Sequence, residues 1–344
     1  STTTHMIIIW SLMMGTIITM TSHHWLLAWL GLEMNTLAIV PIISMQHHPR
    51  STEAATKYFL TQAAASAMIL FSSMTNAWHT GTWDITQMTN TPSHILITSA
   101  LAMKLGLVPM HFWLPEVLQG STMTTALIIT TWQKLAPMSL IYMTMNNLST
   151  TILLALGIMS SMLGGWAGLN QTQTRKIMAY SSITHLGWMS AVASIMTNIL
   201  MLNLLVYLIM TTTMFYSLTL SKSKTIKDTS TSWTISPTLT IIMMLTLLSL
   251  GGLPPLTGFV PKWLIMEELM MQNLMTFTMM MALSSLLSLF FYLRLNYTTT
   301  LTLSPNTTQT KHKWRFKPTS LTFPLIMMFP MAALLLPIMP LVIY

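Results

Sequence analysis

The sequence predicts an all-α integral membrane protein with about eleven transmembrane helices. Composition, segment length and charge distribution support this. Charged residues make up 6% of the chain and apolar ones 52%, with a mean hydropathy of +0.61. Because soluble domains carry about 25% charged residues, we expect this chain to lie in a membrane.

Apolar segments of roughly 16–23 residues, long enough to cross about 30 Å of hydrocarbon, recur along the chain. The fourth and ninth continue past prolines into stretches 110–118 and 256–271, which we interpret as the second halves of broken helices. The eleven predicted spans lie near residues 6–21, 25–44, 56–77, 93–109, 122–143, 149–168, 176–196, 199–220, 236–253, 274–294 and 322–343.

The basic residues are distributed asymmetrically. Loops after the second, sixth, eighth and tenth spans hold 12 of the 15 lysines and arginines, and the opposite loops hold none. By the positive-inside rule, the N-terminus is expected on the matrix or cytoplasmic side and the C-terminus on the other. The net charge of +8 therefore indicates topology rather than a nucleic-acid surface. The twelve residues are Arg50, Lys57, Arg175, Lys176, Lys222, Lys224, Lys227, Arg294, Lys311, Lys313, Arg315 and Lys317.

A Gly-Leu-x-Pro motif occurs twice, 146 residues apart. Residues 106–116 match residues 252–262, and each copy follows an apolar span and ends in a charge. The two spans are five apart, so the copies are expected to face opposite ways, as in inverted repeats of transporters. We therefore predict one domain over residues 1–344. It comprises five-helix repeats at 6–143 and 149–294, a basic matrix-side loop at 295–321 and an additional helix at 322–344.

Three lysines and one glutamate lie deep within apolar segments: Glu33, Lys104, Lys134 and Lys262. Each would cost at least ~2.5–3.5 kcal/mol at mid-membrane on insertion scales. Snorkelling to an interface or a single structural ion pair is the alternative. The favoured interpretation is a proton relay, with His185 and His111 as weaker candidate members.

Several other chemistries lack sequence support. The chain has no cysteine, which excludes thiolate metal sites and cysteine-ligated iron–sulfur clusters. No G-x-G-x-x-G or P-loop pattern is present. Only His185 lies at mid-depth, so a haem held between paired histidines is not expected. We predict no metal or cofactor on this chain.

Six stretches together resemble the antiporter-like membrane subunits of respiratory complex I, the NADH:ubiquinone oxidoreductase of the mitochondrial inner membrane. The resemblance covers nearly the whole chain and is weakest at 1–20 and 296–320. The stretches are Gly31–Asn35 (GLEMN), Arg50–Gln62 (RSTEAATKYFLTQ), Met103–Glu116 (MKLGLVPMHFWLPE), Thr131–Pro137 (TWQKLAP), Asn170–Ser182 (NQTQTRKIMAYSS) and Gly251–Trp263 (GGLPPLTGFVPKW).

The resemblance implies an Mrp antiporter-like fold shortened from fourteen helices to eleven. It also implies a hydrated axis in which Glu33 pairs with Lys104 and continues through Lys134 and Lys262. NADH, FMN, iron–sulfur clusters and ubiquinone would be handled by other subunits. Neighbouring antiporter-like subunits and lipids such as cardiolipin would be partners.

Two other function classes remain open at this stage. A standalone cation/proton antiporter would share the fold, although no aspartate lies at mid-membrane to bind sodium. A purely structural anchor for assembly would tolerate neutralisation of all four buried charges.

Overall fold

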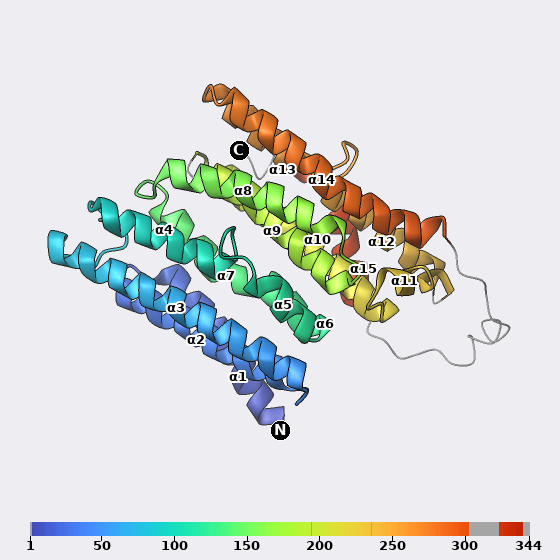
Figure 1. Cartoon of the computed structure of the whole chain (residues 1–344), viewed down its shortest axis with the longest axis horizontal. Coiled ribbons are helices and arrows are strands. Elements are labelled where there is room, and N and C mark those ends of the chain that lie inside the picture. The colour runs from blue at the N-terminus through green and yellow to red at the C-terminus, as the bar shows by residue number, and fades with distance from the viewer. Residues whose placement is uncertain (1, 194, 235, 303–322, 340–344) are drawn as a thin grey trace. The chain divides into compact units, whose positions relative to one another are not determined.

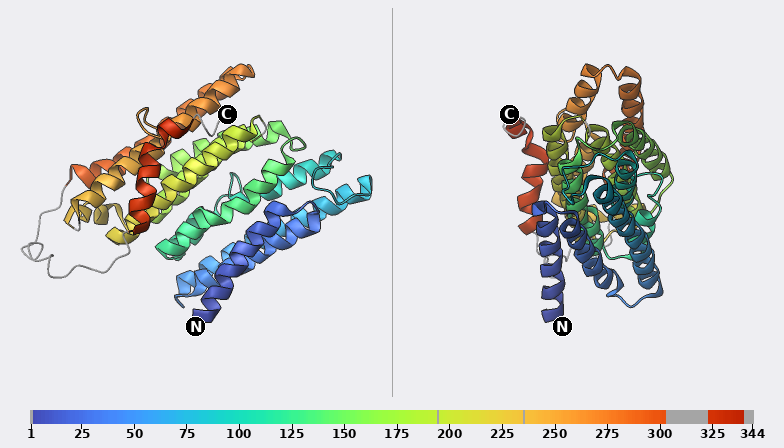
Figure 2. Two further views of the ribbon diagram at one scale, coloured as in Figure 1. Left: turned by 180° about the vertical axis from the view of Figure 1, so that it is seen from behind. Right: turned by 90° about the vertical axis from the view of Figure 1, so that its left-hand side faces the viewer.

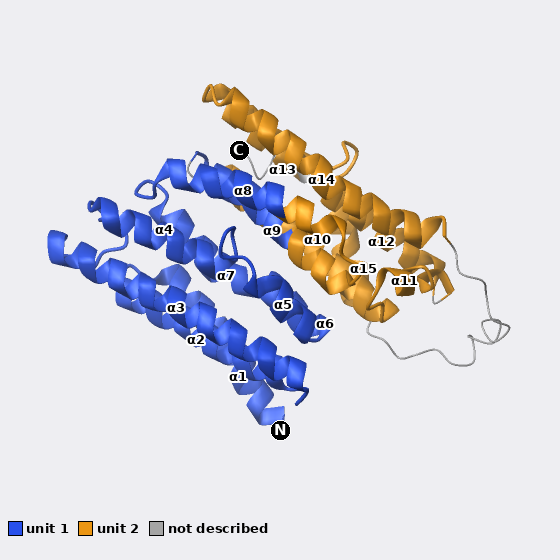
Figure 3. Cartoon of the chain, viewed as in Figure 1, with its two compact units in different colours: residues 1–163, 182–197 blue, residues 164–181, 198–344 orange. Residues whose placement is uncertain are grey.

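The computed structural model describes residues 2–193, 195–234, 236–302 and 323–339 of the chain (Figure 1). Its regular elements within those residues are helices, as the composition predicted. The chain divides into two compact units, shown in Figure 3. Unit 1 contains residues 1–163 and 182–197, and unit 2 contains residues 164–181 and 198–344.

Unit 1 is built around the helix hairpin α1–α2 and the long helix α3. Helices α1 and α2 run side by side (Figures 1 and 2), and they approach closely at Gly15 and Gly31. A Cβ atom on Gly15 would lie 2.8 Å from the carbonyl oxygen of Gly31. Close packing through small residues is typical of membrane helices. The helices are α1 (Thr2–Thr21), α2 (Trp25–Ser44), α3 (Pro49–Thr80), α4 (Thr91–Leu105), α5 (Trp113–Gly120), α6 (Met123–Thr130) and α7 (Trp132–Thr144).

Helices α8 (Thr150–Leu169) and α9 (Thr174–Val192) each contribute residues to both units. In unit 2, α14 packs against α11, α12 and α13, and α12 also contacts α15. The other elements of this unit are α10 (Thr197–Ser221), α11 (Ile226–Thr229), the 3-10 turn η1 (Ser232–Thr234), α12 (Pro237–Gly251), α13 (Phe259–Met271), α14 (Met275–Thr300), α15 (Phe323–Leu334) and the 3-10 turn η3 (Leu336–Ile338).

One backbone arrangement occurs at the start of α2 and again at the start of α9. In unit 1, Trp25 N–H donates to the Trp83 carbonyl and Ile85 N–H donates to the His23 carbonyl. In unit 2, Thr174 N–H donates to Lys224 and Ile226 N–H donates to Thr172 in the same way. Each pair forms an isolated antiparallel bridge, His24 with Asp84 and Gln173 with Thr225. The second residue of each bridge follows the end of the next helix, α3 or α10.

A second shared arrangement ends α4 and α12. Both helices are 15 residues long, and each is followed by a glycine in the left-handed region, Gly106 with φ +83° and Gly252 with φ +80°. The next residue, Leu107 or Leu253, donates its N–H to the carbonyl five residues back. These bonds form a Schellman cap, which glycine favours because it has no Cβ. The next half-helices, α5 and α13, start 146 residues apart.

The eleven predicted spans all contain helix among the described residues, but several boundaries differ. The fifth, predicted as continuous over 122–143, is interrupted at Thr131 between α6 and α7. Pro137 explains part of this, because it has no N–H to donate to the Gln133 carbonyl. The fourth ends at Leu105 instead of 109, where Gly106 caps it.

The C-terminal predictions differ more. Residues 295–300, predicted as loop, continue α14. In the last span, predicted over 322–343, Phe323–Leu334 is helical and the 3-10 turn with Pro337 follows; residues 322 and 340–343 lie outside the described residues. Pro337 cannot donate to the carbonyl four residues back. The basic residues from Lys311 to Lys317 lie outside the described residues.

By length and apolar composition alone, five of the described helices could each cross a membrane: α1, α2, α8, α10 and α14. Helices α12 and α15 are apolar but shorter. The others are broken or carry more polar residues. The structure thus has the apolar helices of a multi-pass membrane protein.

Candidate functional site

The break after α4 places Lys104 inside unit 1. Lys104 lies in the last turn of α4 and is 4% exposed. Trp113 of α5 donates from Nε1 to the Met103 carbonyl at 3.2 Å, which ties the second half-helix to the end of the first. The C-terminus of a helix carries partial negative charge, which favours a cation at this position.

Glu33 of α2 is half-buried, and two hydroxyl groups hold its carboxylate. Thr36 Oγ1 donates to Oε2 at 2.9 Å, and Ser66 Oγ of α3 donates to Oε1 at 3.3 Å. The carboxylate attracts the ammonium of Lys104 electrostatically. No ion pair within 4.0 Å joins them, and Lys104 Nζ has no hydrogen-bond partner among the protein atoms. Their coupling is therefore through space rather than by contact.

Lys134 lies in the first turn of α7, three residues after the interruption at Thr131, and is 5% exposed. The neighbouring Gln133 donates from Nε2 to the hydroxyl of Tyr58 on α3. Tyr58 is buried edge-on against Trp113, with 5.8 Å between ring centroids. Through these contacts α3 packs against α5 and against the first turn of α7, which contains Lys134.

Lys262 belongs to unit 2. It lies on α13, is 8% exposed, and donates from Nζ to the Gly251 carbonyl at 3.0 Å. Gly252 leaves the room for it, because a Cβ at that position would lie 3.0 Å from Lys262 Nζ. The lysine thus occupies the C-terminal end of α12.

The two histidine candidates are both buried in unit 1. His111, in the break between α4 and α5, contacts the Pro109 carbonyl through Nδ1 at 3.3 Å and packs on Phe112. His185 lies on α9. Within the described ranges, His, Asp and Glu side chains form no group of three that could hold a metal ion.

Glu116, which matches Lys262 in the repeat, points to the surface. Its carboxylate lies 2.7 Å from Lys57 Nζ, and Lys57 also lies 2.5 Å from Glu53. The hydrogen bond and charge of Lys57 lower the pKa of Glu53. These groups are well exposed, and such surface pairs contribute little to stability.

Three buried amide side chains were not identified from the sequence. Asn35 of α2, Gln62 of α3 and Gln133 of α7 line one small cavity in unit 1 together with Lys104. Amide side chains inside apolar segments are the signal that could have found them, since burial of an unpaired polar group is unfavourable. Unit 2 contains a pocket with a different lining.

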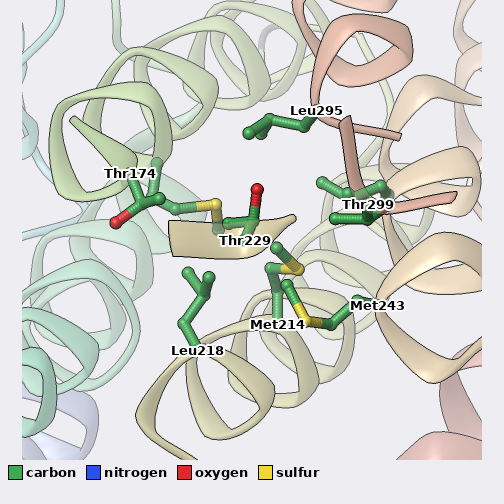
Figure 4. A pocket seen from close by; sticks show the side chains of 9 residues that line it. Thr174, Met214, Leu218, Thr229, Met243, Leu295 and Thr299 are labelled. Atoms are coloured by element: carbon green, nitrogen blue, oxygen red, sulfur yellow. The ribbon is translucent and has the colours of Figure 1, made fainter. Parts of the chain in front are cut away.

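Figure 4 shows this pocket of unit 2, where methionine and threonine side chains converge. It has no volume that admits a water molecule. Met214 and Met243 point into it beside Thr229 (Figure 4). Flexible methionines fill irregular gaps well, so we interpret this pocket as packing.

Comparisons with known proteins place the chain. Residues 22–288 match the family model described as NADH:quinone oxidoreductase/Mrp antiporter, TM, and residues 289–343 match NADH dehydrogenase subunit 2 C-terminus. Proteins named NADH-ubiquinone oxidoreductase chain 2 are 55% identical in Varanus baritji and 54% identical in Gallus gallus. The matches cover 98% of each chain in the first case, and 97% of this chain and 96% of the relative in the second.

Solved structures agree. A chain of respiratory complex I from Thermus thermophilus with bound Aureothin matches with a TM-score of 0.80 and 25% identity, over 94% of this chain and 77% of that one. A chain of the Mrp complex from Dietzia sp. DQ12-45-1b shares the fold, with a TM-score of 0.77 and 17% identity, over 85% and 59%. The resemblance drawn from the motifs is confirmed, and the named vertebrate relatives are chain 2 of NADH-ubiquinone oxidoreductase. The chain belongs to the family of membrane proteins that the NADH:quinone oxidoreductase and Mrp antiporter subunits form.

Proposed function

We propose that this chain is a core membrane-arm subunit of the proton-pumping NADH:ubiquinone oxidoreductase in the mitochondrial inner membrane. It moves protons from the matrix to the intermembrane space, driven by redox chemistry in other subunits. The names of relatives more than 50% identical support this role over a standalone cation/proton antiporter. The chain is then a subunit of an H⁺-translocating enzyme and has no redox site of its own.

The proposed relay consists of Glu33, Lys104 and Lys134 in unit 1 and Lys262 in unit 2, with His185 and His111 in lesser roles. The observation that carries it is Lys104, buried with no hydrogen-bond partner and attracted by Glu33 without contact. A change in the charge of Glu33 alters the free energy of the Lys104 proton. Through-space coupling of this kind lets one group load or unload the other.

The proposed topology has eleven spans, two inverted five-helix repeats and one domain. It is supported by the paired bridges at α2 and α9 and the paired caps at α4 and α12. The two members of each pair are five spans apart, so the copies face opposite ways. The charge distribution of the loops supports a matrix-side N-terminus and a C-terminus on the intermembrane-space side.

Partners and cofactors follow from the same assignment. Other complex I subunits, above all neighbouring antiporter-like ones, bind this chain, and lipids such as cardiolipin contact its surface. The chain itself binds no cofactor. NADH, FMN, iron–sulfur clusters and ubiquinone belong to the assembled complex.

Replacement of Lys104 or Lys134 by Met in the assembled complex tests the relay. We expect proton flux per NADH oxidised to fall at least fivefold in each variant. Lys57→Met is the matched control, because the same change at an exposed lysine should leave the flux unchanged. Proton pumping is measured in sealed membrane vesicles beside the rate of NADH oxidation. Normal pumping in the Lys104→Met, Lys134→Met double variant would contradict the relay.

A further inference from the structure

The break after α12 is bonded to the C-terminal helix α15. Thr257, one residue before the N-cap of α13, is 1% exposed and donates from Oγ1 to the Ala332 carbonyl of α15. Both residues belong to unit 2. In a helix, a threonine hydroxyl can bond to a carbonyl three or four residues back, and that of Thr213 does so with Met210. Thr257 instead joins two elements that are far apart in the chain.

The acceptor carbonyl lies at a helix end that needs donors. Helix α15 ends at Leu334, so the Ala332 carbonyl is among the last four, which have no partner within the helix. The small pocket at this contact, lined by α10, the break and α15, has no volume that admits a water molecule. Inside a membrane, no solvent is available to bond an unpaired carbonyl. The Thr257 hydroxyl therefore supplies a donor that water cannot replace.

The next residue, Gly258, fixes where α13 begins. A Cβ on Gly258 would overlap the Ser249 carbonyl of α12 and would lie 3.2 Å from Met210 Sδ of α10. Only glycine lets the chain approach both helices so closely. Because Thr257 also bonds to α15, the start of α13 is enclosed by three helices: α10, α12 and α15.

Lys262 depends on this geometry. It lies four residues after Gly258, about one turn along α13, and its Nζ donates to the carbonyl of Gly251, the last residue of α12. This hydrogen bond spans the break, so its length depends on how α13 is placed against α12. A movement at the start of α13 therefore changes the distance between the ammonium and its acceptor.

We infer that Thr257 is a positioning residue for Lys262 and that it acts through α15. The hydroxyl anchors the start of α13 to α15, which keeps the ammonium at the end of α12. The contact also joins two parts of the chain with different matches: residues 22–288 match the antiporter model, and residues 289–343 match the subunit 2 C-terminus. A helix outside the antiporter match thus sets the geometry of a lysine inside it.

The first break is held in a different way. Its residue at the matching position, 146 residues before Thr257, is His111. This side chain contacts the Pro109 carbonyl of its own segment, and Trp113 donates to the end of α4. Loss of the contact with α15 should therefore affect the lysine of the second break only.

This inference rests on the proposed function, and the variant Thr257→Val tests it in the assembled complex. Valine has nearly the shape of threonine but no hydroxyl, so the start of α13 loses its bond to α15. We expect proton flux per NADH oxidised to fall at least threefold and its dependence on matrix pH to shift. Thr257→Ser, which keeps the hydroxyl, should restore most of the flux and the original pH profile.

Thr213→Val is the matched control. Thr213 is fully buried in α10, and its hydroxyl bonds to a carbonyl of its own helix. Its replacement removes the same atom from unit 2 and should leave both the flux and the pH profile unchanged. If the two valine variants lower the flux equally with the same pH profile, the effect is general to buried hydroxyls and the positioning role is wrong.

A density map of the unmodified complex that resolves the side chains of α13 and α15 provides the second measurement. We expect Thr257 Oγ1 within hydrogen-bond distance of the Ala332 carbonyl. A larger separation overturns the inference even if Thr257→Val does not assemble. If Lys262→Met lowers the flux while Thr257→Val pumps normally, the positioning role fails and the relay stands. If Lys262→Met pumps normally, the relay fails at this lysine and the positioning role fails with it.

Discussion

In unit 1 the broken helix α4 carries its own lysine, whereas in unit 2 the lysine at the end of α12 comes from the second half-helix, α13. Both breaks have the same capped glycine and start their half-helices 146 residues apart. The matching positions do not carry matching charges. Leu250 corresponds to Lys104, and Lys262 corresponds to Glu116.

In both units the buried lysine lies at the C-terminal end of a helix, although the two lysines occupy different positions relative to the Gly-Leu-x-Pro motif. Each break exposes the negative end of a helix dipole in a region of low dielectric, where a lysine is favoured. Lys104 and Lys262 each place an ammonium group at such a helix end. The two lysines differ in their hydrogen bonding: Lys262 Nζ donates to the Gly251 carbonyl, whereas Lys104 Nζ has no hydrogen-bond partner in the protein.

Removing each lysine should therefore affect stability unequally. Lys262→Met leaves the buried Gly251 carbonyl without this donor, and we expect a loss of about 1–3 kcal/mol. Lys104→Met removes a buried charge that has no hydrogen bond, so the expected change is near zero or stabilising. Thermal unfolding of the detergent-solubilised complex, monitored by release of this subunit, measures both.

An equal loss in both variants would contradict the distinction between a held lysine and an unbonded one. Lys57→Met serves again as the control for loss of a lysine at an exposed site.

The glycines at the two breaks offer a finer test. Alanine at Gly106 or Gly252 adds a Cβ in the left-handed region, which costs about 1–2 kcal/mol at either site. At Gly252 the Cβ also meets Lys262, whereas at Gly106 it meets Leu114. A double-mutant cycle separates these contributions. In the Lys262→Ala background, which removes Cδ and Cε as well as Nζ, we expect Gly252→Ala to be less destabilising and Gly106→Ala to be unchanged. Additive effects at both glycines would show that Lys262 does not occupy the space beside Gly252.

The sequence predicted the features that depend on one distinctive local signal, such as a long apolar segment or a glycine and proline at a helix end. The span 25–44 coincides with α2, and both Gly-Pro breaks lie where the motif placed them. The interruption at Thr131 was missed because Pro137, its signal, stands six residues away inside an apolar run. The amide cavity was missed because Asn35, Gln62 and Gln133 are far apart in sequence, and only packing of α2, α3 and α7 brings them together.

The paired bridges were likewise invisible in sequence, because the bridge beside His24 and that beside Gln173 share backbone geometry and no residue pattern. Backbone hydrogen bonds depend on the path of the chain rather than on side-chain identity. For this reason the two halves are more alike in their helix starts and bridges than in the motif, where four of eleven aligned residues are identical.

The chain that follows the bridge differs between the two units. After the unit 2 bridge, Thr225 and Asp228 form a capping box on α11, with Asp228 Oδ2 accepting from the Thr225 and Lys224 N–H groups at 2.9 and 3.0 Å. After the unit 1 bridge, the chain at Ile85 forms no helix. We expect Asp228→Ala to cost about 1 kcal/mol locally. Amide hydrogen exchange at 224–229 would then be about fivefold faster, with exchange at 83–88 unchanged.

The same carboxylate makes this cap depend on pH. Partial burial raises the pKa of Asp228, but its hydrogen bonds with Thr225 and Lys224 lower it more, so the pKa lies below its ordinary value. Because the folded pKa is lowered, the stabilisation is complete above the ordinary aspartate pKa of about 3.9 and is lost as pH falls through the folded value. Exchange at 224–229, corrected for the intrinsic rate, should lose its protection relative to 83–88 only below that pH. A loss that begins near neutral pH would mean that another group stabilises this cap.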